Sequence, residues 1–238
     1  MEVASLYREP EAERDDLTFG ALEFHDVFKI YRSGPVETVA LRGLDLRVDP
    51  GELVALHGPS GSGKSTALQL AAALDEPSAG DVRPLGRSLS RLTESELADY
   101  RSEQVAIIFQ SGNLWPQLSA VENVQLALRL AHRRGADSAA ERALDMFGLA
   151  GRAGQRAGTL SGGEQQRVAI AAAAAREAPL VLADEPTAEL DEANETVVLR
   201  AMRQLRDEFG STVLVITHSP RVAEAVDRVL ELRDGTLV

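Results

Sequence analysis

A glycine-rich segment early in the chain has the residue types and the spacing that bind phosphate. It reads Gly58, Pro59, Ser60, Gly61, Ser62, Gly63, Lys64, Ser65 and fits the pattern G-x-x-x-x-G-K-[ST]. The glycines let backbone N–H groups turn toward phosphate oxygens, and the helix expected from Thr66 adds positive partial charge. We expect Lys64 to reach the β- and γ-phosphates of a nucleotide and Ser65 to hold Mg²⁺. A glycine- and serine-rich surface turn is the alternative, and it would not need the flanking strand and helix.

Two adjacent carboxylates, Asp184 and Glu185, follow a run of apolar residues. In a chain with a phosphate loop, one carboxylate of such a pair can bind the metal ion and the other can activate the attacking water. Asp184 would meet Mg²⁺ through water, and Glu185 would polarise the attacking water. The alternative is a carboxylate pair that caps the next helix, a start that Pro186 would mark. Gln110 and His218 end two other apolar runs, and neither is informative when taken alone.

Four apolar runs must position these side chains. They are residues 53–56, 105–109, 180–183 and 213–216, which lead into the phosphate loop, Gln110, Asp184 and His218. Short continuous runs of Val, Ile and Leu are typical of strands buried on both faces of a largely parallel sheet. Because ligands of open α/β sheets bind at the carboxyl ends of the strands, we expect the four segments to converge on one crevice.

The remaining segments are predicted to form antiparallel strands, helices and a tail. Residues 20–56 alternate between apolar and polar side chains and contain turn signals, so they are interpreted as mostly antiparallel β. The pattern is helical over residues 93–146, with a helical insertion expected at about 111–159, and residues 164–175 favour a helix by propensity. Residues 1–19 are interpreted as an acidic, disordered tail, with an acidic interaction arm as the alternative.

The composition excludes several classes of protein. The 238 residues include 37 acidic and 25 basic side chains, which give a net charge of −12 and predict no nucleic-acid partner. The same balance argues against direct docking on anionic lipid. The absence of cysteine excludes disulfides, thiolate metal sites and cysteine nucleophiles. No apolar run approaches the roughly 18 residues that span a bilayer, and the N-terminus lacks a signal-peptide pattern.

The segment between the phosphate loop and the carboxylate pair indicates a family. Residues 161–167 read Ser-Gly-Gly-Glu-Gln-Gln-Arg and resemble the signature of ATP-binding cassette (ABC) ATPases. The resemblance covers about residues 20–238, interpreted as one ATP-binding domain, and the motifs follow the family's order. It implies an α/β fold of the P-loop NTPase type: a mostly parallel sheet core, an N-terminal antiparallel β subdomain and an inserted α-helical subdomain. It also implies ATP hydrolysis, with ATP and Mg²⁺ bound.

The resemblance implies roles for residues that are uninformative alone. Tyr31 is similar to the aromatic residue that stacks on adenine, although a strand aromatic of the β subdomain is the alternative. Gln110 is similar to the glutamine that contacts Mg²⁺ and water and senses the membrane partner. His218 is similar to the histidine that contacts the γ-phosphate, and Asp191 to a residue at the dimer contact. The signature that grips the γ-phosphate across the dimer corresponds to Ser161, Gly162 and Gly163.

A finer resemblance is to the ATPases of lipoprotein release, macrolide export and cell division. It is carried by residues 74–80, 109–114, 120–124 and 182–187. It implies a homodimer on the cytoplasmic face of the cell membrane, together with an integral membrane subunit that docks near Gln110 and Trp115 and changes shape as ATP is used. An importer ATPase and a soluble ABC ATPase of cofactor assembly are the alternatives.

Trp115, the only tryptophan, precedes Pro116 just beyond Gln110. In the family this region lines the groove for the membrane subunit. Since exposed aromatic residues often anchor interfaces, Trp115 is interpreted as packing on that partner or, alternatively, as filling a local core. The chain departs from the family away from the catalytic positions, with Pro84 in a stretch that is normally a strand and Glu189 where a small residue or Asn is usual.

Overall fold

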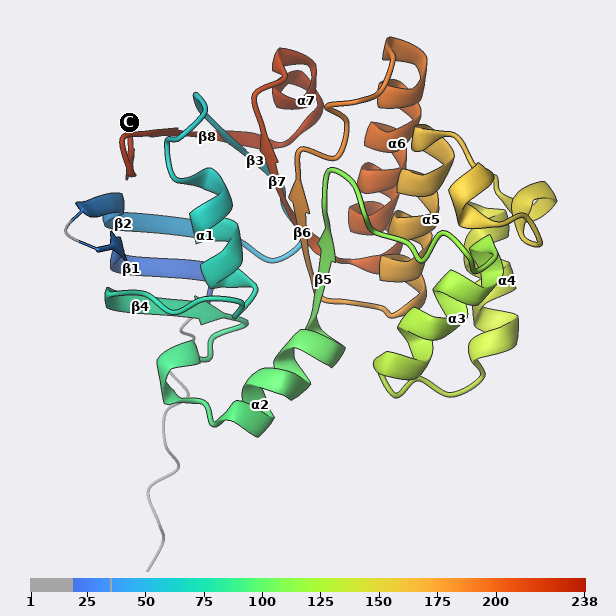
Figure 1. Cartoon of the computed structure of the whole chain (residues 1–238), viewed down its shortest axis with the longest axis horizontal. Helices are drawn as coiled ribbons and strands as arrows, with labels where there is room; N and C mark the ends of the chain where they lie inside the picture. Colours follow the sequence, from blue (N-terminus) through green and yellow to red (C-terminus); the bar gives the residue numbers. More distant parts are fainter. Residues whose placement is uncertain (1–18, 35) are drawn as a thin grey trace, which may run out of the picture.

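The computed structural model describes residues 19–34 and 36–238 (Figure 1). Apart from Phe19, the predicted acidic tail lies outside the described residues. Two sheets and seven α-helices are present in the described part of the chain. None of these helices has the length and the hydropathy that crossing a bilayer requires.

The central sheet contains all four of the predicted buried strands. Its order is β5-β6-β7-β3-β8-β9, and the pairs from β5 to β8 are parallel, whereas β8 and β9 are antiparallel. The strands are β3 (Leu53–His57), β5 (Val105–Ile108), β6 (Leu180–Asp184), β7 (Thr212–Thr217), β8 (Arg228–Arg233) and β9 (Thr236–Leu237). In β3, β5, β6 and β7 the apolar side chains alternate between two buried faces, which explains why these four runs are continuously apolar.

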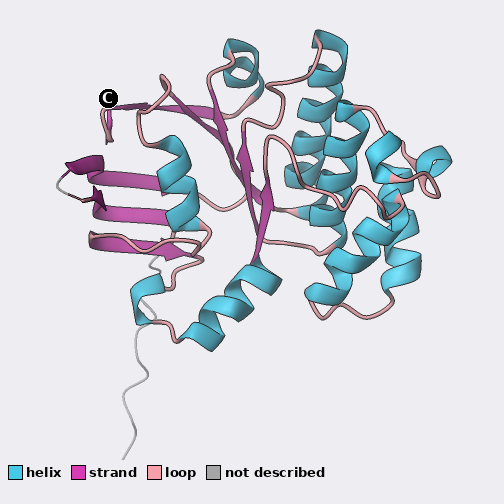
Figure 2. Ribbon diagram, in the orientation of Figure 1, coloured by secondary structure: helices cyan, strands magenta, loops and turns pink. Residues whose placement is uncertain are grey.

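A second, three-stranded antiparallel sheet lies beside the first (Figure 2). Its strands are β1 (Leu22–Ser33), β2 (Val36–Val48) and β4 (Ala79–Pro84), with β1 in the middle. The prediction of antiparallel β over residues 20–56 is confirmed for β1 and β2, whereas β3 belongs to the parallel sheet. Pro84 does not interrupt β4, because it is the last residue of that strand, where a proline is tolerated.

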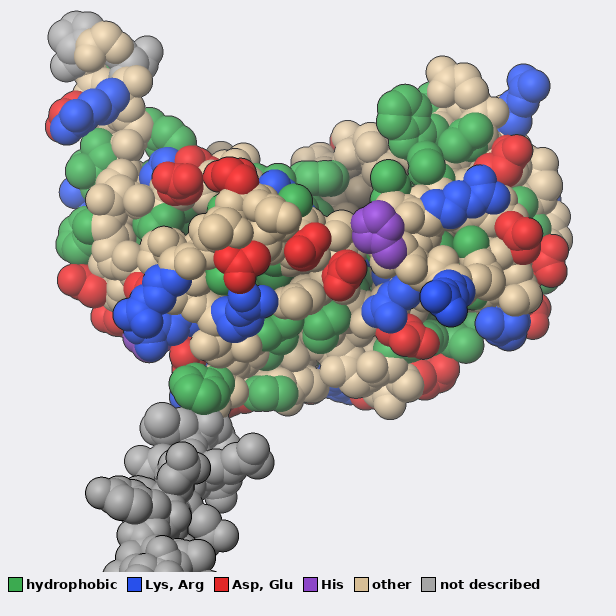
Figure 3. Space-filling model, turned by 90° about the horizontal axis from the view of Figure 1, so that it is seen from below, with side chains coloured by type: hydrophobic (Ala, Val, Ile, Leu, Met, Phe, Trp, Pro, Cys, Tyr) green, Lys and Arg blue, Asp and Glu red, His purple; other side chains and the backbone are tan. Residues whose placement is uncertain are grey.

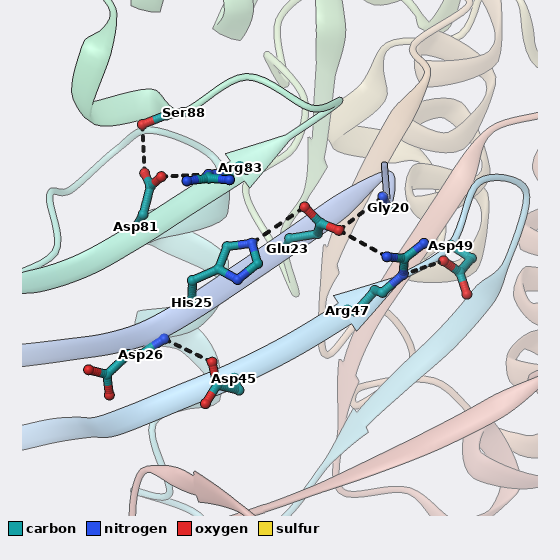
Figure 4. Close-up of polar contacts among 10 residues, drawn as sticks. All are labelled: Gly20, Glu23, His25, Asp26, Asp45, Arg47, Asp49, Asp81, Arg83 and Ser88. Carbon is teal, nitrogen blue, oxygen red and sulfur yellow. Dashed lines mark hydrogen bonds and ion pairs between the residues drawn. The ribbon is translucent and has the colours of Figure 1, made fainter. Parts of the chain in front are cut away.

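The polar face of the antiparallel sheet carries pairs of opposite charge (Figure 4). Buried Glu23 lies opposite Arg47 of β2 and Arg83 of β4, and it accepts hydrogen bonds from Arg47 and the Gly20 amide. Asp81 of β4 accepts bonds from Arg83 and Ser88. The cross-strand pairs of Glu23 with Arg47 and Arg83 favour this register of the sheet, while the opposite side chains of the same strands enter the core.

Seven helices pack around the two sheets, and several begin at capping residues. They are α1 (Lys64–Ala71), α2 (Glu94–Asp99), α3 (Ala120–Leu130), α4 (Ala136–Met146), α5 (Gly162–Ala175), α6 (Glu192–Phe209) and α7 (Pro220–Ala225). Capping boxes start α2 at Thr93, α3 at Ser119 and α5 at Ser161, each with a glutamate three residues later. Helices α3 and α4 fall within the segment predicted as a helical insertion, whereas β5 divides the helical pattern predicted over 93–146.

Two buried cores meet at the parallel sheet. One face of the sheet packs with the antiparallel sheet and α1, and the other packs with α3, α4, α5 and α6. In Figure 1 the antiparallel sheet and the α3–α4 pair lie at opposite ends of the molecule, with the parallel strands between them. Because the parallel strands lie between these two parts, they are in contact with segments from both ends of the molecule.

On the surface drawn in Figure 3, acidic and basic side chains are interspersed.

Candidate active site

The phosphate loop joins β3 to α1 and packs closely against two other strands. A Cβ on Gly63 would lie 2.5 Å from the Ala40 carbonyl oxygen, and one on Gly58 would lie 2.1 Å from that of Leu232. Gly63 also has φ +104°, a conformation that side chains rarely adopt. Both glycines are therefore required by the shape of the loop, in addition to any contact with phosphate.

Lys64 lies buried at the start of α1 with its ammonium group turned toward the loop. Its Nζ donates to the carbonyl oxygens of Gly58 at 2.7 Å and Pro59 at 2.8 Å. Burial lowers the pKa of Lys64, while the charges of Glu185 and Asp184 oppose that change. An ammonium has three donors, so these two bonds leave one to bind phosphate.

Ser62 is a buried polar side chain of the loop, and its Oγ has no hydrogen-bond partner among the described residues. It does not line the cleft at the carboxyl edge of the sheet, so it is not placed to contact a ligand there. The anion-binding character of the loop comes from its backbone N–H groups and from the positive N-terminus of α1, which begins at Lys64.

Asp184 ends β6, and its carboxylate faces the same cleft as the Ser65 side chain. Burial and the charge of Glu185 raise the pKa of Asp184, although Ser65 and the charge of Lys64 oppose this. Two carboxylates that are adjacent and partly desolvated would be stabilised by a divalent cation. The oxygens of Ser65 and Asp184 are the hard donors that Mg²⁺ prefers, so this donor set fits the metal implied by the sequence.

Glu185 and His218 are hydrogen-bonded to each other because β6 and β7 are neighbours. His218 Nδ1 lies 2.7 Å from Glu185 Oε1, and the His218 amide donates to Glu185 Oε2 at 3.4 Å. Glu185 has φ +46°, an uncommon value for a residue with a side chain. The turn after β6 thus directs the carboxylate toward His218. Glu185 is mostly buried, whereas His218 is exposed and accessible from the cleft.

Most of the predicted site residues line one cleft of about 650 Å³ at the carboxyl edge of the sheet. The phosphate loop forms one wall of the cleft, and residues 38–40 of β2 form another. Gln110, which follows β5, and His218, which follows β7, complete the lining together with the carboxylate pair after β6. The lining residues are Thr38, Val39, Ala40, Ser60, Gly61, Gly63, Lys64, Ser65, Thr66, Gln110, Asp184, Glu185, Ala188, Ile216 and His218. An anion-binding loop, two carboxylates and a histidine within one cleft can bind a nucleoside triphosphate and activate a water molecule for attack on its γ-phosphate.

Three groups of predicted residues do not line this cleft. Within the loop, Gly58, Pro59 and Ser62 lie behind the residues that face it. The other two groups are Tyr31 and the signature. Tyr31 of β1 lies directly opposite Thr38, and its hydroxyl donates to Asp75 at 3.0 Å. Ser161 caps α5, so Gly162 and Gly163 occupy the first turn of that helix. Gly162 lines a separate, smaller hollow that also includes Gln110 and Glu189. The signature is therefore presented outside the cleft that holds the phosphate loop of the same chain.

Several polar contacts support the site and were missed by the sequence analysis. Buried Gln166 of α5 donates to the carbonyl oxygens of Phe109 and Gln110, which ties the signature helix to the glutamine loop. Gln110 in turn donates to Glu189 at 3.2 Å. Buried Glu195 of α6 accepts from Thr187 and from Ser219, the residues that follow the carboxylate pair and the histidine. The signature contains Gln166, but the motif does not say which atoms this side chain bonds, and Glu195 belongs to no motif; the partners of both come from the three-dimensional structure.

Comparisons with known proteins agree with this geometry. Residues 41–188 match the model of the ABC transporter family. The chain is 44% identical over 220 residues to the lipoprotein-releasing system ATP-binding protein LolD of Anaeromyxobacter dehalogenans, covering 91% of this chain and 92% of that protein. It is 41% identical over 220 residues to the macrolide export ATP-binding/permease protein MacB of Syntrophobacter fumaroxidans, covering 91% of this chain but 31% of that protein. The chain thus spans about a third of the macrolide export relative.

A solved structure with the same fold is the ATP-binding cassette MJ0796 in a dimeric, post-hydrolysis state bound to ADP and Pi. The two chains superimpose with a TM-score of 0.82 at 37% identity, over 91% of this chain and 96% of that one. The predicted α/β fold of the P-loop NTPase type is confirmed by this likeness. The chain belongs to the ABC transporter family and is an ATP-binding and ATP-hydrolysing protein of the ABC type.

Proposed function

We propose that this chain is the ATPase subunit of a membrane complex. It works as a dimer at the cytoplasmic face of the cell membrane, and its ATP hydrolysis drives a conformational change in an integral membrane subunit. The observation that carries the proposal is the cleft in which Lys64, Asp184, Glu185 and His218 meet while the signature lies outside it. A site divided in this way needs a second copy to complete it. The likeness to LolD and MacB supports release or export as the process driven.

Nucleotide and metal would be held by separate groups of the cleft. The phosphates would lie in the loop, bound by Lys64 and by the N–H groups of the loop, while Thr66 and the start of α1 contribute positive partial charge. Mg²⁺ would be held by Ser65, by Asp184 through water, and by Gln110. When bound, the metal would neutralise negative charge on the β- and γ-phosphate oxygens. Tyr31 would stack on the adenine, beside Thr38 at the rim of the cleft.

Hydrolysis would depend on Glu185 and His218. Glu185 would accept a hydrogen bond from the attacking water and polarise it toward the γ-phosphate. His218 would hold the γ-phosphate, and its bond to Glu185 would orient the carboxylate. The water attacks phosphorus, the bond to the bridging oxygen of ADP breaks, and phosphate is released.

The signature would complete the site of a second copy. Ser161, Gly162 and Gly163 begin α5, so a γ-phosphate placed there would meet a helix N-terminus. Asp191, which caps α6 through the Asn194 amide, would lie at the same contact. Closure of the dimer is then a population shift driven by ATP, because only the closed state makes both sets of contacts.

Trp115 supports a docking surface for the membrane subunit. Its side chain is 64% exposed, which is incompatible with the alternative of a local core residue. The Trp115 amide donates to Asn123, so the backbone is fixed while the indole stays free for a partner. It borders a groove with α3 and α5 that also includes Leu130 and Arg176. Gln166 links this region to the glutamine loop, a route by which nucleotide state would reach the partner.

Replacing Trp115 with alanine is expected to weaken binding of the membrane subunit by roughly 10-fold or more, since exposed aromatic anchors often cost at least about 2 kcal/mol when truncated. ATP hydrolysis by the isolated chain should stay within twofold of the unmodified protein. Pull-down against the copurified membrane protein measures the first quantity. Met146→Ala, an equally apolar change on the exposed surface of α4, is the control. Unchanged affinity in a folded Trp115→Ala variant would remove this residue from the interface.

The function itself is tested by purifying the full chain from its own membranes in mild detergent and identifying what accompanies it. A four-helix membrane protein with a large extracytoplasmic domain is the expected result. A six-helix permease would shift the function to an importer or an ordinary exporter. Recovery of the chain without any membrane protein, and wholly in the soluble fraction, would favour an ATPase of cofactor assembly and refute the proposed location.

A further inference from the structure

The residue interpreted as stacking on adenine is held by a polar cluster to which the sequence analysis assigned no role. The cluster consists of Lys29 and Tyr31 on β1 and Asp75 and Glu76 in the segment after α1. Tyr31 donates its hydroxyl to Asp75 Oδ2 at 3.0 Å. Lys29 Nζ donates to Asp75 Oδ1 at 2.6 Å and to the Glu76 carbonyl oxygen at 2.7 Å. The same ammonium lies 4.9 Å from the centre of the Tyr31 ring, a cation–π distance.

These contacts leave the tyrosine ring little freedom. Its edge is anchored by the hydroxyl bond to Asp75, and the Lys29 ammonium lies over one face of the ring. The lysine side chain is 12% exposed, so the cation is held in place and not free in solvent. The Tyr31 side chain is itself 38% exposed, which leaves a face for a planar ligand. A ring fixed before binding loses less conformational entropy when a base stacks on it.

The backbone carries the cluster at a fixed distance from the phosphate loop. Helix α1 begins at Lys64, inside the loop, and ends at Ala71, four residues before Asp75. The segment after it is joined to β1 by further bonds, from the Ile30 amide to Ser78 and from the Ser78 amide to the Phe28 carbonyl oxygen. One rigid helix therefore connects the group that binds phosphate to the group that holds Tyr31. This connection sets the spacing between the phosphate and base subsites.

We infer that Asp75 is a positioning residue for the nucleotide base: it fixes the Tyr31 ring at the rim of the cleft and thereby contributes to the preference for adenine nucleotides. The inference rests on the proposed role of Tyr31. Thr38, directly opposite Tyr31 in the sheet, lines the cleft next to Val39 and Ala40. A nucleotide with its phosphates in the loop would extend along these residues toward the ring.

The electrostatics of Asp75 agree with this role. Burial alone would raise its pKa, but hydrogen bonds from Lys29, the Glu76 amide and Tyr31 outweigh burial and lower the pKa. The carboxylate is therefore ionised at neutral pH. An ionised Asp75 accepts from the tyrosine hydroxyl and from the lysine at the same time, so its loss would release the hydroxyl and leave the lysine held by the Glu76 carbonyl oxygen alone.

The test is a double-mutant cycle on the full chain, with ATP and inorganic tripolyphosphate as the two ligands in equilibrium binding. Tyr31→Ala should weaken ATP binding by roughly 10-fold, the range found when a stacked aromatic is removed. Asp75→Ala and Tyr31→Phe should each weaken it by about threefold, and Asp75→Ala should add nothing in the Tyr31→Ala background. Tripolyphosphate, which has no base, should bind all variants as it binds the unmodified chain.

Asp81→Ala is the matched control, because Asp81 is also a partly buried carboxylate with two side-chain partners. It lies on β4 beside Arg83 and Ser88, opposite His25 of β1 and away from the tyrosine cluster (Figure 4). It should leave both ligands unaffected. The inference about Asp75 is overturned if Asp75→Ala leaves ATP binding unchanged, weakens both ligands equally, or has the same effect with and without Tyr31. If Tyr31→Ala itself leaves ATP affinity unchanged, the adenine role of Tyr31 is wrong and the inference falls with it, while tripolyphosphate binding would still report an intact phosphate loop.

Discussion

Glu185→Gln is expected to lower the rate of ATP hydrolysis by a factor of about 10² to 10⁴, the usual contribution of a positioned general base. The amide keeps the size of the side chain and can still contact His218, but it cannot take up a proton from water. Binding of ATP should be unchanged or tighter, because a negative charge beside the γ-phosphate is removed. Single-turnover phosphate release measures the rate, and equilibrium titration measures the affinity.

The same variant should make the proposed dimer visible. If hydrolysis reopens the closed pair, blocking hydrolysis traps it, so Glu185→Gln should elute as a dimer in ATP and as a monomer in ADP during size-exclusion chromatography. The unmodified chain should show only a transient dimer. Near-normal turnover in the variant would remove Glu185 from the catalytic role, and a monomer in ATP despite blocked hydrolysis would contradict closure driven by nucleotide.

The strands that deliver the site could be predicted because their burial leaves a strong mark on the sequence. Residues of β3, β5, β6 and β7 are apolar on both faces, which few other local structures require. The antiparallel strand β4 was missed because it lies beyond α1 and ends in proline, although it pairs with β1. The position of β4 in the sheet depends on pairing with residues distant in sequence, such as Arg83 with Glu23. The local sequence pattern around β4 carries no information about those partners.

Motifs identified the groups that would touch phosphate, but they could not identify the side chains that hold those groups. Gln166, Glu195 and Asp75 act through partners 56, 24 and 44 positions away, respectively. Their residue types are common on any surface, so only burial and hydrogen bonding distinguish them. The sequence likewise left open whether Trp115 is buried or exposed, since a tryptophan before a proline fits either environment. In the structure Trp115 is 64% exposed, and its backbone amide donates to Asn123.

Lys64→Ala is expected to weaken binding of ATP by roughly 10- to 150-fold, the equivalent of losing one charge-assisted hydrogen bond of about 1.5–3 kcal/mol. The loss should be smaller for AMP, whose phosphate does not reach the position of the β- and γ-phosphates. The substitution also removes the donor that bridges the Gly58 and Pro59 carbonyl oxygens, so the empty loop should become less ordered. Isothermal titration with ATP, ADP and AMP measures the three affinities.

Lys64→Arg separates charge from shape in the same experiment. It keeps the positive charge, but a planar guanidinium is larger than an ammonium, and Lys64 is 8% exposed with its Nζ between two carbonyl oxygens. If the site requires the compact donor, Lys64→Arg should bind ATP almost as poorly as Lys64→Ala. If charge alone is needed, it should bind like the unmodified chain. ATP affinity in Lys64→Ala within twofold of the original would contradict the proposed contact between this lysine and the phosphates of the nucleotide.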